Sequence, residues 1–325
     1  MNQFTKNIWE ENEYNYRAAY GFIPKIHAYI HDDDENRDCM LIAPGGGYCM
    51  CVPHEGVLPA NEFYDKGMNV FVLTYTTDIT TSIPLKKQPL NDIARAVRFI
   101  RKNASEYKTE GKKIIVCGFS AGAHVCGTLA VHFDDVEDSN PEYADISCRP
   151  DGAILAYPVI TTGKYTHESS VWALIGQNAG EEEMNYFSLE KNVKSNTPPC
   201  FIWQTATDNL VPVENSYLFA NALKEKDVMF AHYVFPEGFH GLSVPNKDFF
   251  TFNYEDYTME QVKLAVAAVK RGEGIDVSDM RVEELKIQFA DDKEDNPPEF
   301  PPNAESLYKD VRYWPDLAME WMKRI

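Results

Sequence analysis

Apolar and polar positions follow two alternating patterns along the chain. Short apolar runs such as "CMLIA" and "NVFVLT" are separated by stretches in which apolar residues recur every three to four positions. The short runs indicate strands buried on both faces of a sheet, and the wider spacing indicates amphipathic helices. We therefore predict strands at 25–30, 39–44, 69–75, 113–118, 152–158, 200–205 and 231–235, and helices at 58–66, 89–106, 120–132 and 214–226.

The regular alternation of strands and helices predicts the fold class. Strands that alternate with helices at this spacing are typical of an α/β protein with a mostly parallel central sheet flanked by helices. No internal repeat interrupts the pattern. We expect residues 1–325 to form a single domain.

Two segments break the alternation. Residues 159–197 are polar apart from a helical pattern at 168–176, and residues 243–309 combine the acidic run "ADDKEDNPPEFPPNAES" with a helical pattern at 258–272. The pattern at 311–325 indicates a final amphipathic helix. Because both irregular segments follow strands, we expect them over the carboxyl edge of the sheet. For 243–309 a substrate-binding cap and an oligomer contact, within a homo-oligomer, are the open alternatives.

Composition limits the classes of partner. The 325 residues are 44% hydrophobic, enough for a large core, and carry a net charge of -19. This charge argues against nucleic acid or an anionic membrane surface as a partner. The seven cysteines are an odd number and scattered, which favours reduced thiols. With no signal-peptide pattern and no apolar run of membrane-spanning length, we expect a cytoplasmic protein.

The stretch "CGFSAGAHV" places Ser120 where a buried strand runs into a helix. A serine at this junction lies on a tight turn, and the flanking Gly118 and Gly122 let strand and helix approach each other. A serine hydroxyl is a poor nucleophile unless an imidazole takes its proton, a carboxylate orients the imidazole and N–H groups bind the oxyanion. Ser120 is therefore a candidate nucleophile.

Two loops after later strands supply the base and the carboxylate. His240 follows the strand at 231–235 in "FPEGFHGLS", and Asp208 follows the strand at 200–205 in "TATDN". Alone, each has an ordinary interpretation, a loop histidine and a turn-capping aspartate. Together with Ser120 they follow the order Ser, Asp, His, which is that of the α/β-hydrolase fold.

The glycine run in "APGGGY" directly follows the strand at 39–44. Backbone N–H groups of Gly46 and Gly47 are candidate oxyanion donors, together with the N–H of Ala121, the residue after the nucleophile. The spacing excludes the G-x-G-x-x-G pattern of dinucleotide-binding loops.

Taken together, "APGGGY", "IIVCGFSAGAHVCGTLA", "TATDNLVPVENS" and "EGFHGLS" resemble the α/β-hydrolase esterases near hormone-sensitive lipase. More narrowly, they resemble the bacterial acetyl-esterase and acetyl-xylan-esterase proteins called BD-FAE. The resemblance runs from about 38 to 242 and resumes in the last helix. It implies a catalytic role for Ser120, Asp208 and His240. The lipase-like group has histidine before its glycine run, whereas this chain has Pro44, as the narrower branch does.

Other polar residues give weaker signals. His27 and His31 are four apart, but in a strand this separation spans roughly 13 Å, too far for two ligands of one ion. Cys49 and Cys51 lack a partner pair at zinc-site spacing, so we expect no metal and no cofactor. We expect His124 to face the interior or a neighbouring loop.

Two residues near the glycine run are candidate substrate contacts. They are Tyr48 and Glu55, although a loop carboxylate is more often solvated or a cap. Aromatic residues in the irregular segments would suit stacking on sugar rings, although local packing is the commoner role: Tyr165, Trp172, Tyr186, Phe187, Phe249 and Phe250.

These signals predict a serine carboxylic-ester hydrolase, and the resemblance implies acetyl or other short acyl groups on sugars or xylo-oligosaccharides. Two alternatives stay open. A serine peptidase of the prolyl-oligopeptidase type shares the order of the three residues, although such enzymes carry a large N-terminal domain. A catalytically inert binding protein shares the fold, although such proteins commonly lose a catalytic residue.

Overall fold

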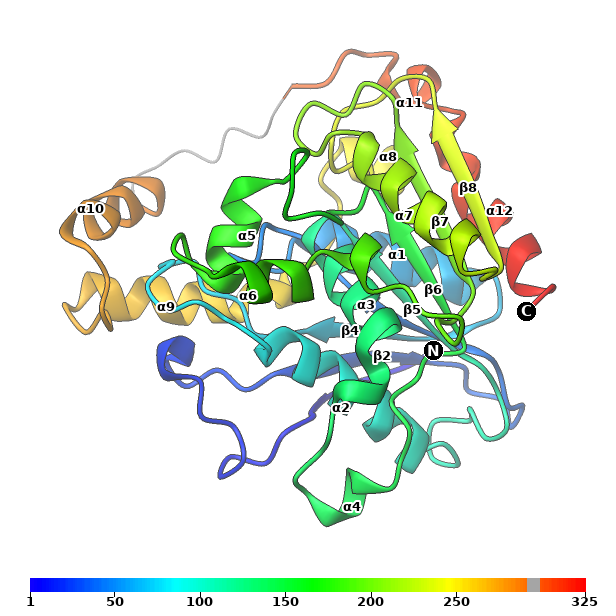
Figure 1. Cartoon of the computed structure of the whole chain (residues 1–325), viewed down its shortest axis with the longest axis horizontal. Coiled ribbons are helices and arrows are strands. Elements are labelled where there is room, and N and C mark those ends of the chain that lie inside the picture. The colour runs from blue at the N-terminus through cyan, green and yellow to red at the C-terminus, as the bar shows by residue number, and fades with distance from the viewer. Residues whose placement is uncertain (291–298) are drawn as a thin grey trace.

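A mixed sheet of eight strands forms the centre of the molecule (Figure 1). The computed structural model describes residues 1–290 and 299–325, so most of the acidic segment before 299 lies outside the described residues. The strands lie in the order β1-β2-β4-β3-β5-β6-β7-β8. They are β1 (Asn2–Asn7), β2 (Lys25–Ile30), β3 (Cys39–Ala43), β4 (Asn69–Thr74), β5 (Ile114–Phe119), β6 (Gly152–Ala156), β7 (Cys200–Thr205) and β8 (Phe230–Phe235).

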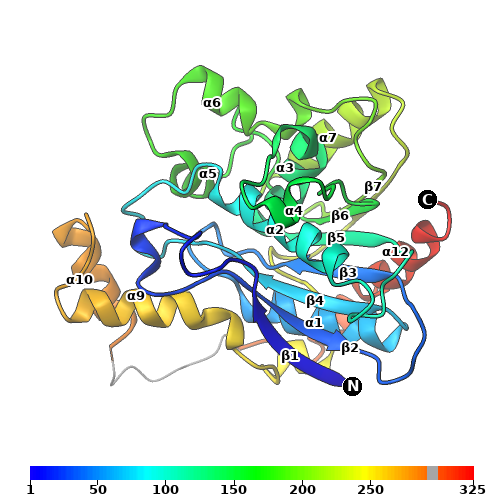
Figure 2. The ribbon, with the colours of Figure 1, turned by 90° about the horizontal axis from the view of Figure 1, so that it is seen from below.

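Pairing from β4 through β8 is parallel, whereas β1 and β2 are antiparallel to their neighbours. The predicted α/β class with a mostly parallel sheet is therefore confirmed. All seven predicted strands are present, but β1 was not predicted. It lies at the margin of the sheet (Figure 2), where only Phe4 of its six residues is not exposed. A strand that buries so little shows no apolar pattern.

Twelve α-helices lie in the described part of the chain. They are α1 (Pro53–Asp65), α2 (Gln88–Lys102), α3 (Ala121–His132), α4 (Pro141–Ala144), α5 (Glu168–Ile175), α6 (Glu181–Tyr186), α7 (Glu214–Glu225), α8 (Lys247–Phe250), α9 (Glu260–Lys270), α10 (Asp279–Gln288), α11 (Ala304–Leu307) and α12 (Trp314–Met322). The helix predicted at 58–66 begins earlier, at Pro53. The prediction began late because the first turn lacks the apolar spacing of a helix. The turn starts on a proline, which suits the first position of a helix.

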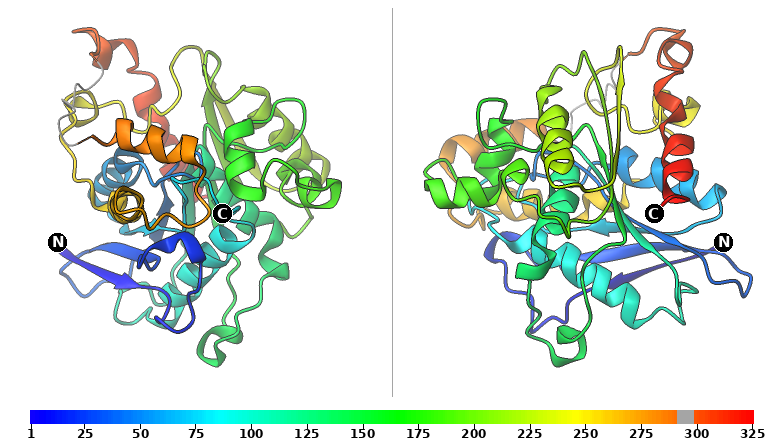
Figure 3. Two further views of the ribbon diagram at one scale, coloured as in Figure 1. Left: turned by 90° about the vertical axis from the view of Figure 1, so that its left-hand side faces the viewer. Right: turned by 45° about the vertical axis from the view of Figure 1, so that its right-hand side comes forward.

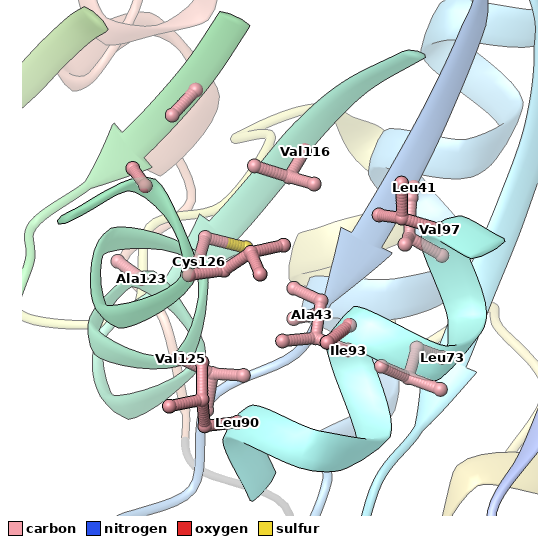
Figure 4. Close-up of a cluster of buried hydrophobic side chains, with 14 of the residues drawn as sticks. Leu41, Ala43, Leu73, Leu90, Ile93, Val97, Val116, Ala123, Val125 and Cys126 are labelled. Carbon is pink, nitrogen blue, oxygen red and sulfur yellow. The ribbon is translucent and has the colours of Figure 1, made fainter. Parts of the chain in front are cut away.

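Alternate residues of each central strand face two separate helical layers. Leu41 belongs to the cluster that includes α2, α3 and α7, whereas Met40 belongs to the cluster that includes α1 and α12. Figure 4 shows the first layer, with Val97 beside Leu41 and Ile93 beside Ala43. Burial on both faces explains why these strands are apolar throughout.

Segment 243–309 is more helical than the sequence indicated. Within the described residues it contains α8, α9, α10 and α11, of which only the helix at 258–272 was predicted. Helices α9 and α10 pack against each other at the periphery of the molecule (Figure 3), and their apolar faces enclose a small third core around Leu285. No helix of the described residues is long and apolar enough to cross a membrane.

Candidate active site

Ser120 lies between β5 and α3 with φ 52° and ψ -118°. Residues other than glycine rarely adopt a positive φ, so the turn is strained. A Cβ on Gly122 would lie 2.1 Å from the carbonyl oxygen of Ala43, and a Cβ on Gly118 would lie 2.2 Å from that of Gly122. Both positions therefore require glycine, for the close approach that the sequence predicts.

The structure brings Ser120, His240 and Asp208 into one hydrogen-bonded line. The Nε2 atom of His240 lies 2.7 Å from the Ser120 hydroxyl, and its Nδ1 lies 2.8 Å from the Asp208 carboxylate. Because a carboxylate only accepts hydrogen bonds, Nδ1 carries the proton and Nε2 is free to accept from the serine. The Asp208 side chain is buried, and its other carboxylate oxygen accepts from the N–H groups of Leu210 and Val211.

The glycine loop faces the same serine. Gly46 and Gly47 have φ values of 123° and 64°, and within the described residues neither N–H, nor that of Ala121, donates to a protein acceptor. The N–H of Gly45 is instead bonded to Glu55 at 2.7 Å. Of the three loop glycines, only Gly46 and Gly47 therefore keep an N–H without a protein acceptor.

A pocket of about 530 Å³ opens over Ser120 and His240. Its lining includes Gly46 and Gly47 together with a group of aromatic side chains. We call that group the aromatic wall, which consists of Phe239, Phe249, Phe252, Tyr254 and Phe300. Rings within it pack on one another, with Phe252 stacked on Phe300 at 5.8 Å between centroids. Four of its five members come from segment 243–309.

Comparison with known proteins identifies the family. The BD-FAE family model matches residues 29–223. The chain is 32% identical to the acetyl ester-xyloside bifunctional hydrolase from Caldicellulosiruptor lactoaceticus, whose crystal structure superposes with a TM-score of 0.70 over 84% of this chain and 97% of that chain. This chain belongs to the BD-FAE family of α/β-hydrolase esterases.

Two curated relatives are longer than this BD-FAE chain. Endo-1,4-beta-xylanase B of Butyrivibrio fibrisolvens is 68% identical over 270 residues, which are 83% of this chain and 42% of that protein. An acetylxylan esterase of Xylanibacter ruminicola is 26% identical over 225 residues, which are 67% of this chain and 43% of that protein. The chain thus spans less than half the length of either relative.

Two histidines that the sequence analysis missed also line the BD-FAE pocket, His54 and His167. Burial lowers the pKa of both imidazoles. His54 packs edge-on against Phe249 of the aromatic wall, and the Nδ1 of His167 lies 2.7 Å from the Ser170 hydroxyl. Neither has a motif around it. The one available signal is that His54 lies beside Glu55 in the first turn of α1.

The predicted substrate contact of Tyr48 is wrong for its side chain. Tyr48 is 2% exposed, and its hydroxyl lies 2.6 Å from Nδ1 of His124, away from the pocket lining. His124 faces the interior as expected. Its Nε2 donates to the carbonyl oxygen of Phe187, and burial lowers its pKa to about 4, so the neutral ring accepts from Tyr48.

The remaining sequence candidates have structural partners. Glu55 reaches the pocket lining, but both carboxylate oxygens accept protein hydrogen bonds. Of the six loop aromatics, only Phe249 lines the pocket. His27 stacks on Tyr257 and His31 on Tyr64, and the described residues hold no group of three or more metal-ligating side chains. All seven cysteines are free, and Cys49 lines the pocket.

Proposed function

We propose that this chain is a serine carboxylic-ester hydrolase that removes acetyl and other short acyl groups from xylo-oligosaccharides. The observation that carries the proposal is the hydrogen-bonded line from Asp208 through His240 to Ser120, which ends beside three backbone N–H groups without protein acceptors. This arrangement supplies a nucleophile, its base and an oxyanion site in one pocket.

In the proposed mechanism, His240 removes the proton of Ser120 as its oxygen attacks the ester carbonyl. The N–H groups of Gly46, Gly47 and Ala121 bind the oxyanion, and His240 then gives its proton to the departing sugar alcohol. A water molecule, deprotonated by His240, attacks the acyl-serine, and His240 returns that proton to the Ser120 oxygen as the acid leaves. Asp208 holds the ring tautomer and stabilises the imidazolium in both steps.

Sugar esters are the proposed substrates because of the relatives and the aromatic wall. Acetylxylan esterase is the name of one relative, and aromatic rings suit the apolar faces of sugars. The relative named as a xylanase is a longer protein, and the match with this chain covers 42% of it. Glycosidic cleavage commonly needs two carboxyl groups across the bond, whereas Glu55 is the single carboxylate among the described pocket-lining residues and both its oxygens are engaged.

The proposal includes the organisation of the chain. Residues 1–325 act as one domain, and segment 243–309 serves as a cap that supplies most of the aromatic wall. A contact within a homo-oligomer is the alternative role of this segment, and it stays a prediction from the sequence.

The testing experiment measures hydrolysis of p-nitrophenyl acetate, butyrate and octanoate, of acetylated xylo-oligosaccharides and of the matching anilide. Wild type should prefer acetate, release acetate from the sugars and cleave the anilide poorly, and Ser120→Ala should lose nearly all activity. Preferential cleavage of the anilide would favour the peptidase alternative, and inactivity on every substrate would favour the inert binding protein. Activity that persists without Ser120 would refute the mechanism.

A further inference from the structure

A buried carboxylate lies beside the reacting groups without a part in the proposed mechanism. Glu55 is 3% exposed and occupies the first turn of α1. The partial positive charge of a helix N-terminus favours a carboxylate there, although such a buried group also needs hydrogen-bond donors. Its two oxygens take one donor each, from two different parts of the active site.

The first donor fixes the glycine loop. The Gly45 N–H donates to Oε2 of Glu55 at 2.7 Å. A Cβ on Gly45 would lie 2.7 Å from that oxygen and 2.9 Å from Cβ of Ser120, so Gly45 is held between the carboxylate and the elbow. Anchoring this residue sets the direction in which the next two N–H groups, those of Gly46 and Gly47, point.

The second donor connects Glu55 to the base. The Tyr157 hydroxyl donates to Oε1 of Glu55 at 2.9 Å, and the Tyr157 ring packs edge-on against the His240 ring at 5.0 Å between centroids. Tyr157 directly follows β6, has φ 36°, and its N–H donates to the carbonyl oxygen of Trp203 at 2.7 Å. Its ring is thus fixed from the backbone side as well as from the hydroxyl.

We infer that Glu55, together with Tyr157, is a positioning residue that sets the oxyanion donors of the glycine loop relative to His240 and Ser120. The inference rests on the proposed function. This positioning role replaces the substrate contact predicted for Glu55. The role should affect the transition state more than the ground state, because misdirected N–H groups weaken oxyanion binding more than binding of the neutral ester.

The test compares Glu55→Ala, Glu55→Gln and Tyr157→Phe by kcat and KM for p-nitrophenyl acetate and by affinity for two ketones. The Ser120 oxygen adds to the carbonyl carbon of a trifluoromethyl ketone and an oxyanion forms, whereas the matching methyl ketone binds without reaction. Glu55→Ala should lower kcat by about 10- to 100-fold with KM nearly unchanged, since small misplacements cost that much. Affinity for the trifluoromethyl ketone should fall in proportion, and methyl ketone affinity should stay constant.

The conservative variants Glu55→Gln and Tyr157→Phe test the same inference with smaller changes, and they replace Glu55→Ala if that variant does not fold. A glutamine still accepts from Gly45 N–H, so Glu55→Gln should recover most of kcat. Tyr157→Phe should lower kcat by less than tenfold, with the same pattern between the two ketones. Asp92→Asn is the matched control, because Asp92 is an equally buried carboxylate that binds Trp9 and Thr76 elsewhere. It should lower the melting temperature and leave the ratio of the two ketone affinities unchanged.

Three results would overturn the inference. The first is an unchanged kcat in all three variants, and the second is an equal loss of affinity for both ketones. The third comes from the same kinetics on acetylated xylo-oligosaccharides: a rise in KM confined to these sugar esters would make Glu55 a substrate contact. Failure of the proposed function gives a different result, because wild type would then be inactive on every ester or its activity would survive Ser120→Ala.

Discussion

The two sides of the pocket are built by different means. On one side, the elbow at Ser120 and the glycine loop present backbone N–H groups on turns where a Cβ at Gly46 or Gly122 would clash with backbone atoms. On the other side, the aromatic wall consists of rings that pack on rings, and Phe252 and Tyr254 remain partly exposed. The first side is specified by backbone geometry and the second by side-chain packing.

This difference separates two kinds of effect. Changes on the backbone-built side should reduce turnover of every substrate, because we propose that the groups on that side form and bind the oxyanion. Changes in the aromatic wall should alter the range of substrates while leaving the smallest ester almost unaffected, because ring contacts add binding only to groups that reach them.

The largest effect is expected for Asp208→Asn. The amide would present an NH2 group to Nδ1 of His240, which would place the ring proton on Nε2, where it can no longer accept from Ser120. We expect kcat to fall by about 10⁴-fold on all esters. Steady-state kinetics measure this, with thermal unfolding as a control for folding. A loss below tenfold would show that the carboxylate does not control the tautomer.

Gly46→Ala should have the next largest effect. Its φ is 123°, and an added Cβ would lie 2.5 Å from the carbonyl oxygen of Met50, so the loop must move and carry its N–H away. We expect a loss in kcat of about 100-fold. Gly21→Ala is the matched control, since Gly21 has φ 90° with nothing within 4 Å and lies outside the pocket. Equal losses in both variants would mean that backbone strain, rather than the oxyanion site, determines kcat.

The free energy of unfolding should depend on pH through His124, whose Nδ1 accepts a hydrogen bond from Tyr48 directly after the glycine loop. Burial lowers its pKa to about 4 in the folded chain, against 6.5 for an ordinary histidine. Between these two pKa values the unfolded chain binds more protons at His124 than the folded chain does. The contribution of the neutral ring to the free energy of unfolding is therefore complete above pH 6.5 and is lost as pH falls toward 4, by about 3 kcal/mol.

Denaturant unfolding of wild type and His124→Asn across this range isolates the contribution from that of the other histidines. The variant should be less stable at pH 7, and the difference should narrow toward pH 4. A difference that stays constant with pH would show that His124 does not titrate in this way.

The same difference between the two sides of the pocket explains which features can be predicted from the sequence and which cannot. The central strands and the Ser120, Asp208 and His240 loops are marked by local patterns, since a doubly buried strand is apolar throughout and a tight turn requires glycine. The aromatic wall has no local mark, because its rings, from residues 239–254 and from Phe300, meet only in the folded chain. Strand β1 was missed because it is mostly exposed. Tyr48 was misassigned because sequence adjacency to a loop does not give side-chain direction.

The smallest effect is expected on the aromatic wall. Phe252→Ala removes a ring that stacks on Phe300 and leaves the hydrogen-bonded side untouched. We expect kcat/KM for octanoate and for acetylated xylo-oligosaccharides to fall by about tenfold, with acetate within twofold. Tyr313→Ala, at a residue 52% exposed and outside the pocket, is the control. A uniform loss on all substrates would contradict the division between the two sides.

The most direct test of the central claim is the site of covalent labelling by a fluorophosphonate, located by peptide mass spectrometry. We predict one adduct, on Ser120, whose formation stops the hydrolysis of p-nitrophenyl acetate and slows by at least about 100-fold in Asp208→Asn. An adduct on another residue, or labelling of Ser120 at an unchanged rate in Asp208→Asn, would contradict it.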